Sequence, residues 1–213
     1  MFILPESTVV NRVIPKNSFE NYLDKNQHKQ IFSFIKKITW LNKLSLDTVN
    51  LRGVHINEIQ VFMVELKENK SINTVLSIIS KAIPYSVIYI IKNGENTCCS
   101  VSIIKAIDVN PRGSTNKWII SSEWNSIKQF NYCINLKYSL DYVLFDICSQ
   151  IVKAPVSITN LDQLVEYNRK LKDLTRQMEI VSNSIKKVKH FKEKVQLNLT
   201  LKNIKEEIIK LNK

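Results

Sequence analysis

The spacing of apolar residues changes near Ala154-Pro155, and this change constrains the fold more than any other feature of the chain. Before it, "EIQVFMVELK" (58–67) has the period of a strand, and "SVIYII" (86–91) is apolar on both faces, as a central strand is. After it, apolar residues recur at three- and four-residue intervals, which is typical of a heptad seam. We therefore predict an α+β domain over residues 1–152 and basic amphipathic helices over residues 153–213.

The α+β domain is expected to contain one mixed β-sheet with flanking helices. Ser18 is a candidate cap for a first helix over 19–37, and Ser139 for a helix that ends near residue 152. Residues 1–17, with two prolines, are predicted to form an extended arm. The remaining predicted elements are strands at "ITWLNKL", "DTVNL", "CSVSII" and "KWIISSEW", a helix from Ser71 to Pro84, a hairpin turn at Asn93-Gly94, and a loop at "DVNPRGSTN".

The C-terminal helices carry an apolar seam that must be covered by something. A lone amphipathic helix is only marginally stable in water, so the seam predicts docking to a partner, a second copy or the chain itself. The heptad spacing of the seam is interrupted around 189–194. There the chain either turns back as a helical hairpin or continues as one long coiled-coil-like helix with a new partner. The predicted docking residues are Leu164, Leu171, Leu174, Met178, Val181, Ile185 and Val188, and after the break Leu197, Leu201, Ile204, Ile208 and Leu211.

The chain is strongly basic, with a formal net charge of +12 over 213 residues. Such a balance favours an anionic partner such as nucleic acid, although a lysine-rich composition alone also produces it. The predicted nucleic-acid contacts are Lys186, Lys187, Lys189, Lys192 and Lys194, for which the alternative is a solvated helix face.

Several functional classes lack their sequence signatures. Only three glycines are present, and neither a Rossmann nor a P-loop motif occurs. The three histidines and four cysteines show neither zinc-ligand spacing nor the context of a catalytic triad. We see no signal peptide and no apolar run long enough for a membrane span, and we expect a cytoplasmic protein with reduced cysteines.

One short motif allows an enzymatic alternative. Glu65 and Lys67 share a strand face and form the E-x-K spacing of restriction-type nucleases, in which a carboxylate and an upstream acid hold Mg²⁺ and the lysine assists the attacking water. Asp47 is the upstream acid, with Glu58 as a substitute. The same residues also fit a solvated strand end, because E-x-K is common in lysine-rich chains. Mg²⁺ would be the cofactor of this alternative alone.

Nearly the whole chain resembles a bacterial family catalogued as domain of unknown function 4391. The resemblance rests on "LPESTVVNRVIPKNSF", "ITWLNKLSLDTVNL", "EIQVFMVELKE" with "KAIPYSVIYII", "SSEW" and "HFKEKVQLNLTLKNIKEEI". The chain departs from the family pattern in "NTCCSVS". The resemblance supplies no catalytic residue, but it implies genes next to helicases and DNA methyltransferases of restriction-like defence clusters.

Two functions follow as hypotheses. The first is a non-enzymatic accessory subunit of a bacterial antiphage or restriction-like system. It would dock a helicase, a DNA methyltransferase or a second copy through its C-terminal helices, and contact DNA but no membrane. The alternative is a Mg²⁺-dependent nuclease built on Asp47, Glu65 and Lys67.

Overall fold

A computed structural model describes residues 2–67, 72–104 and 118–212 of the chain. The chain divides into two compact units, residues 1–152 and residues 153–213, which we describe separately. No helix of the described residues is long and apolar enough to cross a bilayer.

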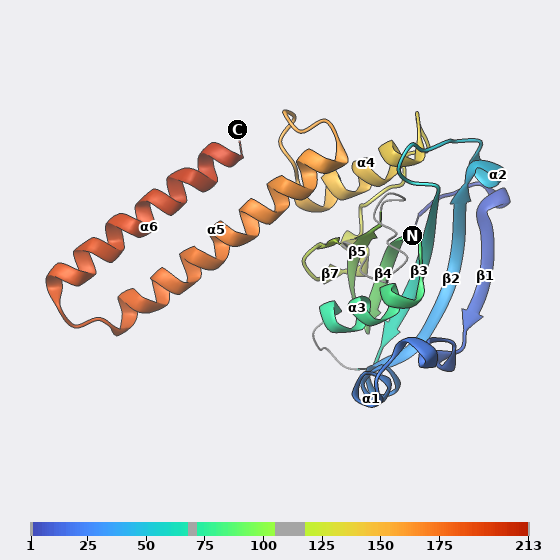
Figure 1. Ribbon diagram of the computed structural model, residues 1–213, viewed down its shortest axis with the longest axis horizontal. Coiled ribbons are helices and arrows are strands. Elements are labelled where there is room, and N and C mark those ends of the chain that lie inside the picture. Colours follow the sequence, from blue (N-terminus) through green and yellow to red (C-terminus); the bar gives the residue numbers. More distant parts are fainter. Residues whose placement is uncertain (1, 68–71, 105–117, 213) are drawn as a thin grey trace. The chain divides into compact units, whose positions relative to one another are not determined.

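The first unit is built on one mixed β-sheet (Figure 1). The strand order is β1-β2-β3-β4-β5-β6, with the short β7 paired to β5. All pairs are antiparallel except β3 with β4, which are parallel and joined through helix α3. The strands are β1 (Val9–Ile14), β2 (Ile35–Ser45), β3 (Glu58–Leu66), β4 (Ser86–Asn93), β5 (Asn96–Ile103), β6 (Trp118–Ser121) and β7 (Asn125–Ser126).

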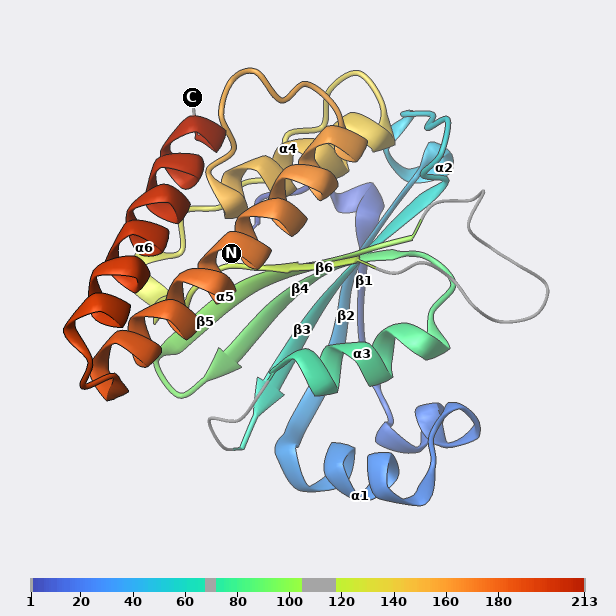
Figure 2. The ribbon, with the colours of Figure 1, turned by 60° about the vertical axis from the view of Figure 1, so that its left-hand side comes forward.

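Helices cover the two faces of the sheet, with α3 (Ile72–Ala82) on one side and α4 (Leu140–Val152) on the other (Figure 2). Alternate residues of a strand point to the same face of the sheet. On the face covered by α3, side chains such as Phe62 and Tyr89 form a buried cluster with Leu76 and Ile79. The first unit also contains α1 (Lys25–Phe34), α2 (Leu46–Val49) and the 3₁₀ turns η1 (Glu6–Thr8), η2 (Lys16–Tyr22) and η4 (Ile127–Gln129).

The central predictions for this unit are confirmed. Residues 86–91 of β4 are all buried, as expected for an inner strand, and β3 occupies Glu58–Leu66. Ser139 caps α4, since the backbone N–H of Tyr142 donates to Ser139 Oγ at 3.1 Å. The predicted loop "DVNPRGSTN" lies outside the described residues.

Three local predictions are wrong. The helix expected over 19–37 is split into η2 and α1, and Ile35 already belongs to β2, because Ile35 and Ile38 are buried through pairing with β3. The extended arm contains strand β1, which pairs with β2. "DTVNL" includes helix α2 rather than a strand, because Ser45 and Thr48 form a capping box and Asn50 ends the helix in the left-handed region at φ 53°.

The second unit is a helical hairpin of α5 (Leu161–Lys187) and α6 (Phe191–Leu211). The two helices pack along one another, and the hydroxyl of Tyr167 donates to Asn212 Oδ1 at 2.6 Å across their open end. Asn160 caps α5, because its side chain accepts a hydrogen bond from the backbone N–H of Gln163 at 3.0 Å. Of the two arrangements left open by the sequence, the chain adopts the hairpin.

Candidate functional site

The structure does not bring the predicted nuclease residues together. Asp47 lies in α2, directly after β2, whereas Glu65 lies near the end of β3. Because β2 and β3 are antiparallel, the end of β2 meets the start of β3, and Ser45 is opposite Glu58. Seven residues of strand, about 23 Å, separate Glu58 from Glu65. Asp47 and its substitute Glu58 are therefore at the opposite end of the strand from Glu65.

Lysines stand where a second metal-binding acid would have to be. The residue opposite Glu65 in β2 is Lys37, and the residue opposite it in β4 is Lys92. Lys36 also contacts it, with Nζ 3.7 Å from Glu65 Oε2. No set of three or more His, Cys, Asp and Glu side chains suited to a metal occurs in the part of the chain that the structure describes. This arrangement offers cations to a ligand and does not support the predicted Mg²⁺ centre.

The other end of β3 carries a neutralised polar cluster. Lys43 Nζ lies 3.0 Å from Glu58 Oε2, and the Gln60 amide donates to Glu58 Oε1. The hydrogen bond to Glu58 and then its negative charge raise the pKa of Lys43. Beside the cluster is a cavity of about 260 Å³, lined by His55, Asn57, Glu58, Pro84, Tyr85, Ser86 and Ile104. The carboxylate of Glu58 is therefore already bound by Lys43 and Gln60.

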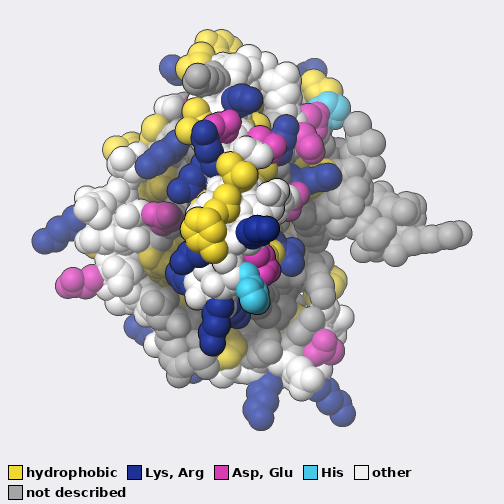
Figure 3. Space-filling view, turned by 90° about the vertical axis from the view of Figure 1, so that its left-hand side faces the viewer, with side chains coloured by type: hydrophobic (Ala, Val, Ile, Leu, Met, Phe, Trp, Pro, Cys, Tyr) yellow, Lys and Arg dark blue, Asp and Glu magenta, His cyan; other side chains and the backbone are white. Residues whose placement is uncertain are grey.

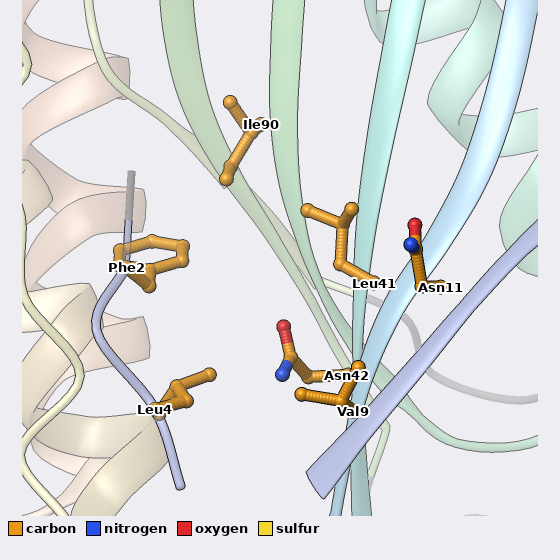
Figure 4. Close-up of a pocket in the computed structure, with 7 residues that line it drawn as sticks. All are labelled: Phe2, Leu4, Val9, Asn11, Leu41, Asn42 and Ile90. Carbon is orange, nitrogen blue, oxygen red and sulfur yellow. The ribbon is translucent and has the colours of Figure 1, made fainter. Parts of the chain in front are cut away.

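A second cavity, of about 220 Å³, lies between the N-terminal segment and the sheet (Figure 4). Phe2 and Leu4 lie opposite Leu41 and Ile90, so its walls are mostly apolar. Two amides, Asn11 and Asn42, complete the lining, and Asn42 already donates from Nδ2 to Thr8 Oγ1 at 2.9 Å. The cavity thus lacks charged or nucleophilic side chains.

The five lysines predicted to contact nucleic acid gather at the tip of the hairpin. Lys186 and Lys187 end α5, Lys189 lies in the connection, and Lys192 and Lys194 are in the first turns of α6. All five are exposed, and a view toward this part of the chain shows Lys and Arg side chains around apolar ones (Figure 3). The hairpin therefore turns a sequence cluster into a compact basic surface, which we call the basic tip.

The tip also presents Phe191, whose residue is 80% exposed. The predicted contacts did not include this side chain. The sequence held a signal for it, because Phe191 is apolar but fits neither the seam that ends at Val188 nor the seam that restarts at Leu197. An aromatic ring so exposed among lysines is suited to stacking on an unpaired base.

The predicted docking residues are only partly covered. Leu164, Leu174 and Ile204 are buried, and the other seam residues are half-buried. A further set of apolar side chains, outside the predicted seam, is exposed: Ile180 on α5, and Val195, Leu199 and Ile209 on α6. Sequence reasoning missed this set because it assigned one seam to each helix.

The chain belongs to the family described as a domain of unknown function, DUF4391, whose model matches residues 2–208. No curated protein and no solved structure matches the chain.

Proposed function

We propose that this protein is a nucleic-acid-binding accessory subunit of a bacterial antiphage or restriction-like system, and that the α5–α6 hairpin is its binding arm. The observation that carries the proposal is the basic tip, where five exposed lysines lie within five residues of an exposed phenylalanine along the chain. Lysines neutralise backbone phosphates without regard to sequence, and base stacking on an aromatic ring is equally tolerant of sequence. The tip is therefore suited to single-stranded or locally opened nucleic acid.

The charge balance at the tip is one-sided. Residues 186–194 contain five lysines and one acid, Glu193. Lys186 and Lys187 also occupy the last turn of α5, where the helix dipole already favours cations. The helix dipole therefore stabilises these two positive charges, and both side chains are exposed to an anionic ligand.

Docking to a protein is the second part of the proposal. Val195 and Leu199 are one helical turn apart on α6 and both are exposed, so a partner helix or groove would gain apolar contact there. The resemblance stated from the sequence favours a helicase or a DNA methyltransferase as that partner, in the cytoplasm, with a second copy as the other candidate.

The nucleic-acid contact is tested with the full chain by fluorescence anisotropy, using a labelled 20-nucleotide DNA strand and the matching duplex. Replacing Lys187, Lys189 and Lys192 together by Glu is expected to weaken binding about tenfold or more at 100 mM salt and to flatten its salt dependence. Phe191→Ala is expected to weaken single-strand binding more than duplex binding.

The matched control changes the same charge elsewhere on the hairpin. Lys170, Lys205 and Lys210 are exposed and lie away from the tip, and replacing them by Glu alters the net charge equally. If this control weakens binding as much as the tip variant does, the tip is not the contact and the proposal fails.

Docking is tested by co-expressing the chain with the proteins encoded next to its gene and measuring whether a helicase or a methyltransferase among them co-purifies. Val195→Glu with Leu199→Glu is expected to abolish co-purification, whereas Asn203→Glu, an exposed polar position on the same helix, is expected to preserve it. Retention of the partner by the double variant would contradict this use of α6.

A further inference from the structure

The cavity of about 260 Å³ beside Glu58 is built where two neighbouring strands begin. Strands β3 and β4 are parallel and adjacent, so the segments that enter them lie at the same edge of the sheet. The segment before β3 contributes His55 and Asn57 to the lining, and the segment before β4 contributes Tyr85. The cavity is therefore formed by residues that only strand pairing brings together.

The walls of this cavity are fixed by hydrogen bonds of their own. The carboxylate of Asp141 accepts from the backbone N–H groups of Val54 and His55, at 2.7 and 3.0 Å. The hydroxyl of Ser86 is also occupied, because it donates to the carbonyl of Ile104 at 3.0 Å and accepts from the N–H of Ile104 at 2.9 Å. A ligand would meet a largely preformed cavity, as is usual for small-molecule sites.

One buried polar atom of a lining residue lacks a partner. Nδ1 of His55 makes no hydrogen bond with any residue that the structure describes. The same is true of Oε1 of Gln60, whose amide nitrogen donates to Glu58. Buried polar side-chain atoms are nearly always hydrogen-bonded, so each exception calls for an explanation. For His55, which lines the cavity, a bound ligand would supply the missing partner.

The other polar groups of the lining indicate what kind of ligand fits. Lys43 and Gln60 hold the carboxylate of Glu58 in place, and its oxygens have further lone pairs that can accept from a ligand. Because Lys43 neutralises this charge, the cavity suits a neutral ligand with N–H donors rather than a cation. The residue Tyr85 is 41% exposed, so its ring is available to stack on a flat molecule.

Size and hydrogen bonding together favour a nucleobase. Sites for drug-sized ligands measure about 300–1,000 Å³, so this cavity takes a smaller molecule. Guanine has adjacent N1–H and N2–H donors for one carboxylate, and its O6 and N7 accept from amide and imidazole N–H groups. Adenine and cytosine offer the carboxylate a single amino group, and thymine and uracil turn carbonyl oxygens toward it.

We propose that this cavity, which we call the base pocket and define by His55, Asn57, Glu58 and Tyr85, binds one guanine base. Glu58 accepts from the N1–H and N2–H groups, and Tyr85 stacks on the face of the base. His55 and Asn57 hydrogen-bond to its O6 and N7. The inference rests on the proposed nucleic-acid function, because the base would be an unpaired nucleotide of the bound strand. It adds a base preference that the phosphate and stacking contacts of the basic tip do not supply.

The test measures anisotropy of the full chain with three labelled strands of 20 nucleotides. One alternates thymine with guanine, one alternates thymine with hypoxanthine, which is guanine without its 2-amino group, and one is all thymine. The wild type is expected to bind the guanine strand at least about fivefold more tightly than the other two. A site that hydrogen-bonds a donor rejects the analogue that lacks it.

Two variants and one control assign this preference to the base pocket. Tyr85→Ala and His55→Leu are each expected to reduce the ratio of affinities to about one. Tyr22→Ala removes another exposed tyrosine of the same unit and is expected to keep the ratio. A preference that persists in both pocket variants would place guanine elsewhere and overturn the inference.

Melting curves separate a binding role from a structural one. His55→Leu removes a buried atom that has no partner among the described residues, so its melting temperature should equal or exceed that of the wild type. If His55→Leu melts at a lower temperature, Tyr85→Ala, at an exposed position, decides the test.

The two proposals fail in different ways. If the wild type binds all three strands equally and the basic-tip variant weakens all of them, the base pocket does not bind guanine and the proposed function survives. If the wild type binds none of the strands, the proposed function fails and guanosine monophosphate becomes the probe. Nuclear magnetic resonance shifts that Tyr85→Ala abolishes would then identify a free nucleotide as the source of the base, and the absence of shifts would overturn the inference as well.

Discussion

The two ends of strand β3 carry the same residue type in opposite surroundings. Glu58 has a 14% exposed side chain, with Lys43 at 3.0 Å and a hydrogen bond from Gln60. Glu65 has a 27% exposed side chain, a longer contact of 3.7 Å to Lys36, and lysines on both neighbouring strands. One carboxylate completes a structural pair, and the other lies in register between Lys37 and Lys92.

The backbone next to β3 is also held by different contacts at the two ends of the strand. The loop before Glu58 is held by Asp141 of α4, whose carboxylate accepts from the N–H groups of Val54 and His55 at 2.7 and 3.0 Å. Beyond Glu65 the backbone N–H of Lys67 donates to the carbonyl of Phe34 at 2.8 Å. The comparison shows that strand pairing and the adjoining loops give the two acids of β3 different neighbours.

The largest effect is expected from a substitution in the loop at the Glu58 end. A Cβ added to Gly53 would overlap the carbonyl oxygen of Ile56 and lie 2.6 Å from Asp141 Oδ2. Gly53→Ala should therefore lower the free energy of unfolding by about 2–3 kcal/mol, measured by urea denaturation.

The matched control for Gly53 lies at the other end of the sheet. A Cβ added to Gly94, in the turn between β4 and β5, meets open space, although its φ of 58° strains any other residue. Gly94→Ala should lower the free energy of unfolding by only about 1 kcal/mol. Equal losses at the two glycines would show that the Glu58 end is not the more tightly built.

The next prediction concerns the two carboxylates themselves. Glu58→Gln weakens a half-buried charged pair and should lower the free energy of unfolding by about 1 kcal/mol. Glu65→Gln removes a more exposed and longer contact, so its effect on stability should stay within about 0.5 kcal/mol. Chemical denaturation of both variants at 100 mM salt measures the difference, and a larger loss for Glu65→Gln would reverse our assignment of roles.

The smallest effect is a pH dependence at the Glu58 end. Glu58 raises the pKa of Lys43 above its ordinary value of 10.5, so the pair contributes stability that is fully present below that pH. This contribution is lost as the pH rises through the folded-state pKa. The difference in unfolding free energy between wild type and Glu58→Gln should therefore shrink as the pH rises above 10.5. A constant difference would show that the charge of Lys43 does not matter.

The elements of the fold were predictable where burial leaves a periodic pattern. The all-apolar run 86–91 indicated a central strand, and the period-two run ending at Glu65 indicated β3. Prediction failed where pairing outweighs local preference. Ile35 fits the face of the predicted helix, yet it is buried in β2, which pairs with a strand that follows later in the chain.

The candidate sites divide in the same way. The basic tip was predictable because Lys186–Lys194 is continuous in sequence, so any compact turn keeps its lysines together. The row of Lys37, Glu65 and Lys92 was not predictable, because its members belong to three different strands. The predicted nuclease trio shows the same limit, since spacing along the chain carries no information about which strand ends meet.

The sequence by itself determined that a sheet domain is followed by basic amphipathic helices, because hydrophobic periodicity and local charge are properties of neighbouring residues. Only the tertiary structure decided which lysine faces which acid. Antiparallel pairing of β2 with β3 places Asp47 beside Glu58 and Lys37 beside Glu65, and register is set by long-range burial. A carboxylate suggestive of metal chemistry in the sequence therefore lies between two lysines, at the other end of the strand from Asp47.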